Sequence, residues 1–199
     1  MNLGAINYNT RDTLNIFYTE GHAAWDFNDD LALRLSAQYT DQRSVGDELI
    51  GAIDTHVGGV RLAASYRNAI LSLAWTSTAD EDSILSPYGG YPGYISLIVQ
   101  DFNRAGEDAW LVGLSYTFAR FGLPGLSVFA NYAAGDTPDT GAGASPDQDE
   151  LDFTIDYRFS GKLENLWLRA RAAHVDQDGP GAVDQDDYRF IVNYSIPLH

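Results

Sequence analysis

Apolar and polar residues alternate one for one along many segments of this chain. In the last segment the even positions from 188 to 198 are all apolar or aromatic, while Asp187, Arg189, Asn193 and Ser195 occupy odd positions. Residues 150–159 repeat the pattern with the apolar side chains at odd positions. Alternation with a period of two predicts β-strands that have one apolar face and one polar face.

Turn-forming residues divide the chain into about ten predicted strands. They cover residues 3–10, 13–27, 31–42, 55–67, 70–79, 108–119, 125–134, 150–160, 165–175 and 187–197. Short connections alternate with long ones that are rich in Gly, Pro and Asp, at 43–54, 80–107, 135–149 and 176–186. This alternation is typical of the periplasmic turns and extracellular loops of a transmembrane β-barrel.

The parity of the apolar positions changes inside one predicted strand. Leu14 and Ile16 are even, whereas Trp25 and Phe27 are odd. The change predicts a β-bulge at residues 20–22, because one extra residue reverses the faces of a strand.

Aromatic residues and hydropathy favour a membrane barrel. Phe, Trp and Tyr make up 13% of the 199 residues, and many of them lie at predicted strand ends, where they would form two girdles. The chain has no run of about 18 apolar residues that would predict a membrane helix. The alternative, a soluble sandwich or lipocalin-like barrel, predicts neither girdles nor alternating loop lengths. The sequence therefore predicts an all-β antiparallel transmembrane β-barrel, with residues 1–199 as one domain. Because Met1 is followed by strand-like residues and not by a signal peptide, we expect a mature or incomplete chain.

Parity also predicts which charged residues face the barrel interior. They are Arg34, Arg61, Arg67, Arg158, Arg169, Arg171 and Arg189, with Asp152, Asp156 and Asp187. Arg169, Arg171 and Arg189 lie on neighbouring predicted strands and form a candidate basic patch. Guanidinium groups suit brief bidentate contacts with carboxylates or phosphates, so the patch would guide anions along the lumen. The alternative is that these arginines pair with wall acids and only fill the interior.

The acidic residues are concentrated at the long loops. About 20 of the 28 Asp and Glu lie in or beside these loops, and the formal net charge is −16. The loops would concentrate cations, bridge divalent metal to lipopolysaccharide phosphates, or simply stay solvated. The Asp residues of 176–187 do not have EF-hand spacing, so no metal site is predicted. The negative charge argues against a nucleic-acid partner, and the absence of cysteine excludes disulfides.

The longest connection, 80–107, is richer in apolar and aromatic residues than a solvated loop requires, and we expect it to fold into the pore and narrow it. Catalytic motifs are sparse. His174 and Asp176 form a lone candidate pair for a barrel protease, and no nucleophile elbow, phosphate loop or zinc-binding spacing is present. We expect no enzyme activity and no cofactor.

Several strings of the sequence resemble the OprD-type specific porins of Gram-negative bacteria. They are DQRSVGDEL at 41–49, SPYGGYPGY at 86–94, DFNRAGEDAWLVGLSYTF at 101–118, LPGLSVFANY at 123–132 and YRFIVNYSIPL at 188–198. The likeness is to the C-terminal part of the family and extends over essentially the whole chain. It implies a monomeric 18-stranded outer-membrane barrel, of which about ten strands are present here.

The resemblance also implies roles for individual residues. Arg169, Arg171 and Arg189 resemble members of the family's basic ladder along the pore wall. The 80–107 loop resembles the in-folded constriction loop, and Asp101 resembles an acid opposite the ladder. Within that loop, the candidate constriction residues are Ser86, Tyr88, Tyr91 and Tyr94.

The expected function is selective passive uptake of small carboxylate-bearing solutes, amino acids among the candidates, across the outer membrane. Other expected partners are outer-membrane lipid, lipopolysaccharide and the barrel-assembly machinery. The alternative is a complete ten-stranded outer-membrane barrel with surface protease activity or a structural role.

Overall fold

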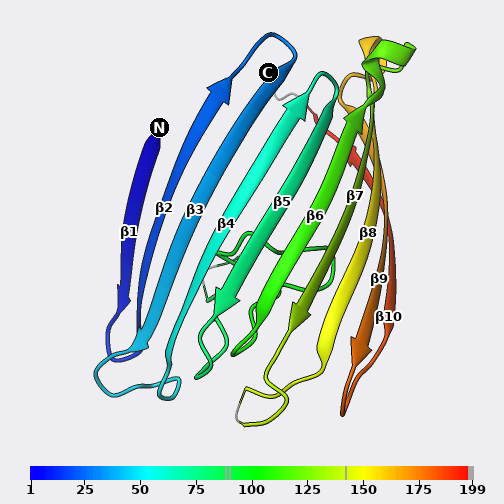
Figure 1. Cartoon of the computed structure of the whole chain (residues 1–199). Coiled ribbons are helices and arrows are strands. Elements are labelled where there is room, and N and C mark those ends of the chain that lie inside the picture. The colour runs from blue at the N-terminus through cyan, green and yellow to red at the C-terminus, as the bar shows by residue number, and fades with distance from the viewer. Residues whose placement is uncertain (88, 90, 142, 197–199) are drawn as a thin grey trace.

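The computed structural model describes residues 1–87, 89, 91–141 and 143–196, which form one curved antiparallel sheet (Figure 1). The ten strands are β1 (Asn2–Thr10), β2 (Leu14–Asp26), β3 (Leu31–Ser44), β4 (Asp54–Tyr66), β5 (Ala69–Thr78), β6 (Asp108–Thr117), β7 (Leu126–Asp136), β8 (Asp147–Arg158), β9 (Leu166–Asp178) and β10 (Gln185–Tyr194). Two short 3-10 turns follow β6 and β8, namely η1 (Phe118–Phe121) and η2 (Gly161–Leu163). No described segment is a helix long and apolar enough to cross a membrane.

The ten predicted strands are confirmed, and their bounds move by three residues or fewer. The predicted end of the last strand, at 197, lies outside the described residues. Each strand pairs with its neighbours in chain order. Within the described part of the chain, β1 and β10 each have one neighbour, so the sheet is open at both edges.

The predicted β-bulge at 20–22 is wrong. The register of β2 with β1 and β3 is unbroken, and Glu20 lies opposite Gly4 on one side and Gln38 on the other. Ile16 therefore points to the inner face of the sheet. There it lines an apolar recess with Leu85 of the loop that joins β5 to β6, residues 79–107. The apolar residues at the start of β2 are inward because a loop distant in sequence packs over them.

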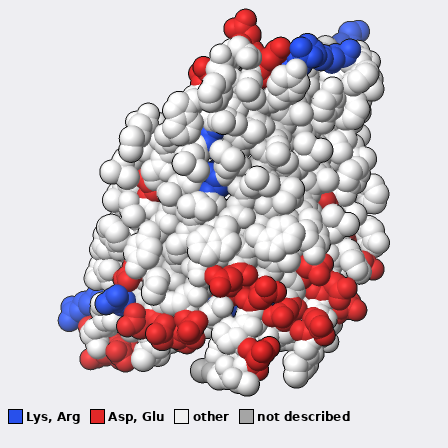
Figure 2. Space-filling model, in the orientation of Figure 1, with Lys and Arg blue, Asp and Glu red and all other residues white. Residues whose placement is uncertain are grey.

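The outer face of the sheet is apolar and exposed. Its large side chains include Leu35, Val60, Leu62, Leu73, Val112, Leu114, Phe153, Ile155 and Phe190, all at least 36% exposed. Figure 2 shows this face as a broad band with few charged atoms, and the largest group of acidic residues lies at the end that carries the long loops. Exposure of so large an apolar surface to water would be unfavourable in free energy. The outer face is therefore suited to an apolar surrounding.

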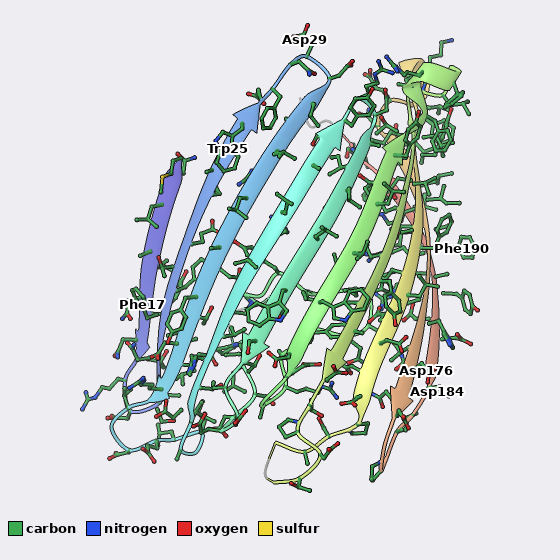
Figure 3. All side chains as sticks on the ribbon, in the orientation of Figure 1. Phe17, Trp25, Asp29, Asp176, Asp184 and Phe190 are labelled. Carbon is green, nitrogen blue, oxygen red and sulfur yellow. The ribbon has the colours of Figure 1, made fainter. Side chains whose placement is uncertain are left out.

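Aromatic residues border the apolar band at both ends. Trp25 lies near the short turn that holds Asp29, whereas Asp176 and Asp184 lie at the opposite end and Phe190 projects away from the sheet (Figure 3). Neighbouring rings pack in pairs at both borders. The Tyr116 and Phe118 centroids are 5.0 Å apart near the short turns, and the Trp110 and Tyr132 centroids are 5.3 Å apart near the long loops. This arrangement matches the two aromatic girdles of a membrane barrel.

The packed core lies on the inner face, between the sheet and the loop that joins β5 to β6. Ile95 and Phe102 of this loop are buried against Ala74, Ala109 and Ala133 of β5, β6 and β7. Alanine side chains allow the loop backbone to approach the wall closely. The sheet and the loop thus enclose a core that the strands alone do not form.

Replacing Leu73 by Arg should destabilise the protein by about 2–4 kcal/mol, because the guanidinium would face hydrocarbon near the middle of β5. Urea unfolding of the full-length protein refolded in lipid vesicles measures this loss. Ser72→Arg is the matched control, because the neighbouring side chain points to the inner face, and we expect a smaller loss. Equal losses for the two variants would contradict the assignment of the faces.

Candidate functional site: a loop held across an arginine-bearing wall

The 79–107 loop crosses the inner side of the sheet, behind β4, β5 and β6 in the view of Figure 1. Its first part is fixed to β3 by Gln42. The Gln42 side chain donates to the Leu85 carbonyl over 2.7 Å and accepts from the Leu85 N–H over 2.9 Å. The Thr55 hydroxyl of β4 donates to the Asp82 carbonyl over 2.5 Å. These contacts hold the outgoing half of the loop to the wall.

The far part of the loop is fixed to β8 and β10. Residues 97–100 form a tight turn, in which the Leu97 N–H donates to the Gln100 carbonyl over 2.9 Å. Asp152 Oδ2 accepts from the Ile98 N–H over 3.1 Å, and the two Glu150 oxygens accept from the N–H groups of residues 99 and 100 over 2.9 and 2.7 Å. Arg189 Nη2 donates to the Ile98 carbonyl over 3.0 Å.

A third group of contacts holds the base of the loop. Glu107 is fully buried and pairs with Arg104 over 2.7 Å. It also accepts from the Gln148 amide over 3.1 Å, while Arg104 donates to the Pro146 carbonyl. The base of the loop is therefore tied both to β8 and to the loop that precedes β8. Gly135 of β7 is needed for this approach, since a Cβ there would lie 2.4 Å from a Glu107 oxygen.

The three predicted ladder arginines lie together on the inner face, as Arg171 is directly opposite Arg189 and Arg169 is opposite Ile191. Arg169 is bound to Asp156 through two bonds of 2.6 and 2.7 Å. Arg189 is bound to Asp187 over 2.8 and 3.0 Å as well as to the loop.

Arg171 has fewer contacts than its two neighbours. Its one hydrogen bond to a described residue is a long one of 3.4 Å to the Thr154 hydroxyl. The guanidinium of Arg171 is thus the least engaged of the three, and it lies between two arginines whose partners hold them in place.

Two of the other predicted inner-face arginines lie over aromatic rings, whereas Arg67 does not face inward. Arg61 lies over the Tyr94 ring at 4.8 Å, and Arg158 lies over the Trp167 ring at 4.9 Å. The prediction for Arg67 is wrong. It lies in the turn after β4, with φ of 55°, and pairs over 3.1 Å with Asp30 of the turn before β3, at the end of the sheet that carries the short turns.

The predicted constriction residues lie in the crossing loop. The Asp101 carboxylate is exposed and accepts from the Ser96 hydroxyl over 2.7 Å, and the Tyr91 hydroxyl donates to the Phe102 carbonyl over 3.3 Å. Burial and the nearby carboxylate of Glu107 raise the pKa of the Tyr91 phenol, so that it remains a neutral donor.

The other predicted loop residues differ in what surrounds them. The Tyr94 ring contacts Arg61, as described above, while Ser86 lines an apolar recess of about 240 Å³ beside β2. Tyr88 lies outside the described residues. The structure shows no contact between Asp101 and the ladder arginines among the described residues, so its role opposite them stays a prediction.

Sequence reasoning missed the residues that hold the loop. Glu150 has the same parity as Asp152, which indicates the inner face, but nothing in the sequence says that both acids bind the backbone of residues 98–100. The candidate catalytic pair is also arranged differently. His174 pairs with Asp186 over 2.9 Å, and both side chains are 58% exposed on the outer side. In the described ranges, no group of three or more His, Asp or Glu is arranged to hold a metal ion.

Comparison with known proteins gives a family and a fold. A sequence model described as outer membrane porin, OprD family, matches residues 4–198. The solved structure of Pseudomonas aeruginosa OccK9 (OpdG) is 27% identical, with a TM-score of 0.89 over 98% of this chain and 50% of that chain. P. aeruginosa OccK1 (OpdK) is 24% identical, with a TM-score of 0.87 over 96% and 51%. Acinetobacter baumannii OccAB3 is 22% identical, with the same TM-score and coverage.

A search among curated protein sequences found no match. The chain spans about half the length of these solved porins, 50% or 51% of each. Ten strands in one open sheet are consistent with part of an 18-stranded barrel.

Arg169→Ala should destabilise the protein by about 3–5 kcal/mol, because it leaves the Asp156 carboxylate, which is 8% exposed, without its cation. The double variant Asp156→Asn/Arg169→Ala should recover part of this loss. Arg171→Ala is the matched control and should be nearly neutral, since it breaks no ion pair. Urea unfolding in vesicles compares the three, and an equal loss for Arg171→Ala would contradict the division between bound and free arginines.

Proposed function

Because the chain belongs to the OprD family of outer membrane porins, we propose that it forms the wall and constriction of a channel for selective passive uptake of small carboxylate-bearing solutes. The observation that carries this proposal is the weakly engaged Arg171 beside Arg189, on the wall to which the crossing loop is bonded. In this proposal the channel lies in the Gram-negative outer membrane and acts without catalysis or cofactor.

The chemistry of the wall supports a carboxylate as the solute group. A guanidinium offers a fork of N–H donors that matches the two oxygens of a carboxylate. Arg171 is available for such contact because its protein partner is a single hydroxyl at 3.4 Å. Arg189 shares its donors between Asp187 and the Ile98 carbonyl, so it would give a solute a weaker second contact.

Asp101 and Arg61 complete the proposed pathway. Asp101 is exposed on the loop and would repel anions from its side, which favours passage along the arginines. Arg61, on β4, carries a guanidinium that contacts a tyrosine face and has no ion pair within the described residues. Ser86, Tyr91 and Tyr94 shape the loop between these charges. A known relative is compatible with such a solute, since OpdK was solved with vanillate, which is a small carboxylate.

The proposal extends to the assembly of the whole channel. We propose that residues 1–199 are one domain and act as part of a monomeric barrel. Its apolar outer face would contact lipid, and its acidic loops would face lipopolysaccharide. The open edges of β1 and β10 expose backbone groups that lipid cannot satisfy, so further strands must pair with both edges in a membrane. Insertion of such a barrel would depend on the barrel-assembly machinery.

Arg171→Ala should reduce uptake of a small carboxylate by roughly fivefold, the factor that corresponds to about 1 kcal/mol for one exposed charged contact. Uptake by vesicles that contain the full-length protein measures this change. Uptake of a neutral solute of the same size is the internal control and should be unchanged.

Arg120→Ala is a matched control variant, because Arg120 is exposed in η1, away from the inner wall. It should leave both solutes unaffected. Unchanged carboxylate uptake in both Arg169→Ala and Arg171→Ala would remove the arginines from the pathway.

A further inference from the structure

Two buried acids of β8 meet the loop where it turns. We propose that Glu150 and Asp152 are positioning residues that hold the turn at 97–100 against the wall and so set the width of the pore. This inference rests on the proposed function only in placing the loop in the conducting path.

The loop supplies hydrogen bonds to three of the four carboxylate oxygens, and the fourth, Asp152 Oδ1, is buried without a partner among the described residues. Glu150 is fully buried and Asp152 is 3% exposed, yet neither has an ion pair within the described residues. A buried carboxylate is costly unless hydrogen bonds satisfy its oxygens. Three successive backbone N–H groups, from residues 98 to 100, supply these bonds over 2.7 to 3.1 Å. Without the turn, the buried carboxylates would lose these hydrogen bonds, and without the acids, the N–H groups of the turn would lose theirs.

The middle of the loop meets the wall through apolar packing and the Arg61–Tyr94 contact, and no wall acid binds it among the described residues. The hydroxyls of Thr40, Thr76 and Thr78 are buried on the inner face of β3 and β5 and have no hydrogen-bond partner among the described residues. The attachment by Gln42 lies more than ten residues before the turn and is made by a neutral amide. The acids of β8 hold three successive N–H groups, whereas Gln42 bonds to one residue of the loop, so the acids fix the position of the turn.

The replacement of Glu150 by Gln tests this role with little change of volume. Each Glu150 oxygen accepts one N–H, from residue 99 or residue 100. In Gln one of these oxygens becomes an NH₂ group, which would face a backbone N–H and cannot accept from it. Asp152 accepts only one N–H, from Ile98, and the amide oxygen of Asn could still accept it, so Asp152→Ala is used to remove the acceptor.

Release of the turn would also free one donor of Arg189. That guanidinium spans from Asp187 to the Ile98 carbonyl, and it thereby connects the turn to the ladder. The pore should then change between narrow and wide states as the turn leaves and rejoins the wall.

The experiment uses the full-length protein with the double variant Glu150→Gln/Asp152→Ala. Residues 1–199 have no cysteine, so Ser96→Cys, with any cysteine in the rest of the protein replaced by Ser, places a single nitroxide label on an exposed position of the loop. We expect an immobilised label in the parent and a mobile one in the double variant. In single-channel recordings, transitions between current levels should become roughly tenfold more frequent or more. Glu164→Gln, at an exposed turn, is the matched control and should change neither.

An immobilised label together with steady current in the double variant would overturn the inference. If the double variant does not assemble, Asp152→Ala alone removes one of the three bonds and should give a smaller increase in both readouts. The outcome is separate from the proposed function. A mobile label combined with normal carboxylate uptake in Arg171→Ala would keep the positioning role and reject the arginine pathway.

Discussion

Hydrocarbon offers no hydrogen-bond partners, so a chain that crosses a membrane as strands must satisfy its backbone within the sheet. The unbroken register from β1 to β10 meets this requirement across nine strand pairs. The same register fixes the direction of every side chain, because a shift of one residue would exchange the two faces. Leu73 and Phe153 can face lipid only while Asp152 and Arg171 face inward.

An apolar outer face leaves the sheet without a core of its own. The loop between β5 and β6 supplies it, since Ile95 and Phe102 bury themselves on a wall of alanines. Larger side chains at Ala74, Ala109 or Ala133 would hold the loop away from the strands. The loop is therefore a structural part of the inner side as well as the proposed constriction, and its backbone polar groups are satisfied by wall residues such as Gln42 and Glu150.

The fold could be predicted from the sequence because successive side chains of a strand point to opposite faces, so the alternation of residue types shows which face is apolar. This explains why the strand positions and the outer face were predicted correctly. The β-bulge in β2 was predicted wrongly because Ile16 owes its inward position to Leu85, which is nearly 70 residues away. Arg67 follows the parity of its strand, but the positive φ at that residue ends the strand before it. The local alternation of apolar and polar residues does not predict contacts between distant segments, and it does not predict where a strand ends.

The site shows the same limit more sharply, because parity places an arginine on a wall but does not say what the arginine binds. Arg169 is engaged by Asp156, Arg189 by Asp187 and the loop, and Arg171 by one distant hydroxyl. On the proposed pathway this inequality matters, because a channel must bind a solute weakly enough to release it. A carboxylate that reaches Arg189 competes with Asp187 for the same donors, so the contact is shallow. Wall acids beside the arginines would therefore favour passage over tight binding, and the mixture of charges on the inner face becomes a condition for conduction.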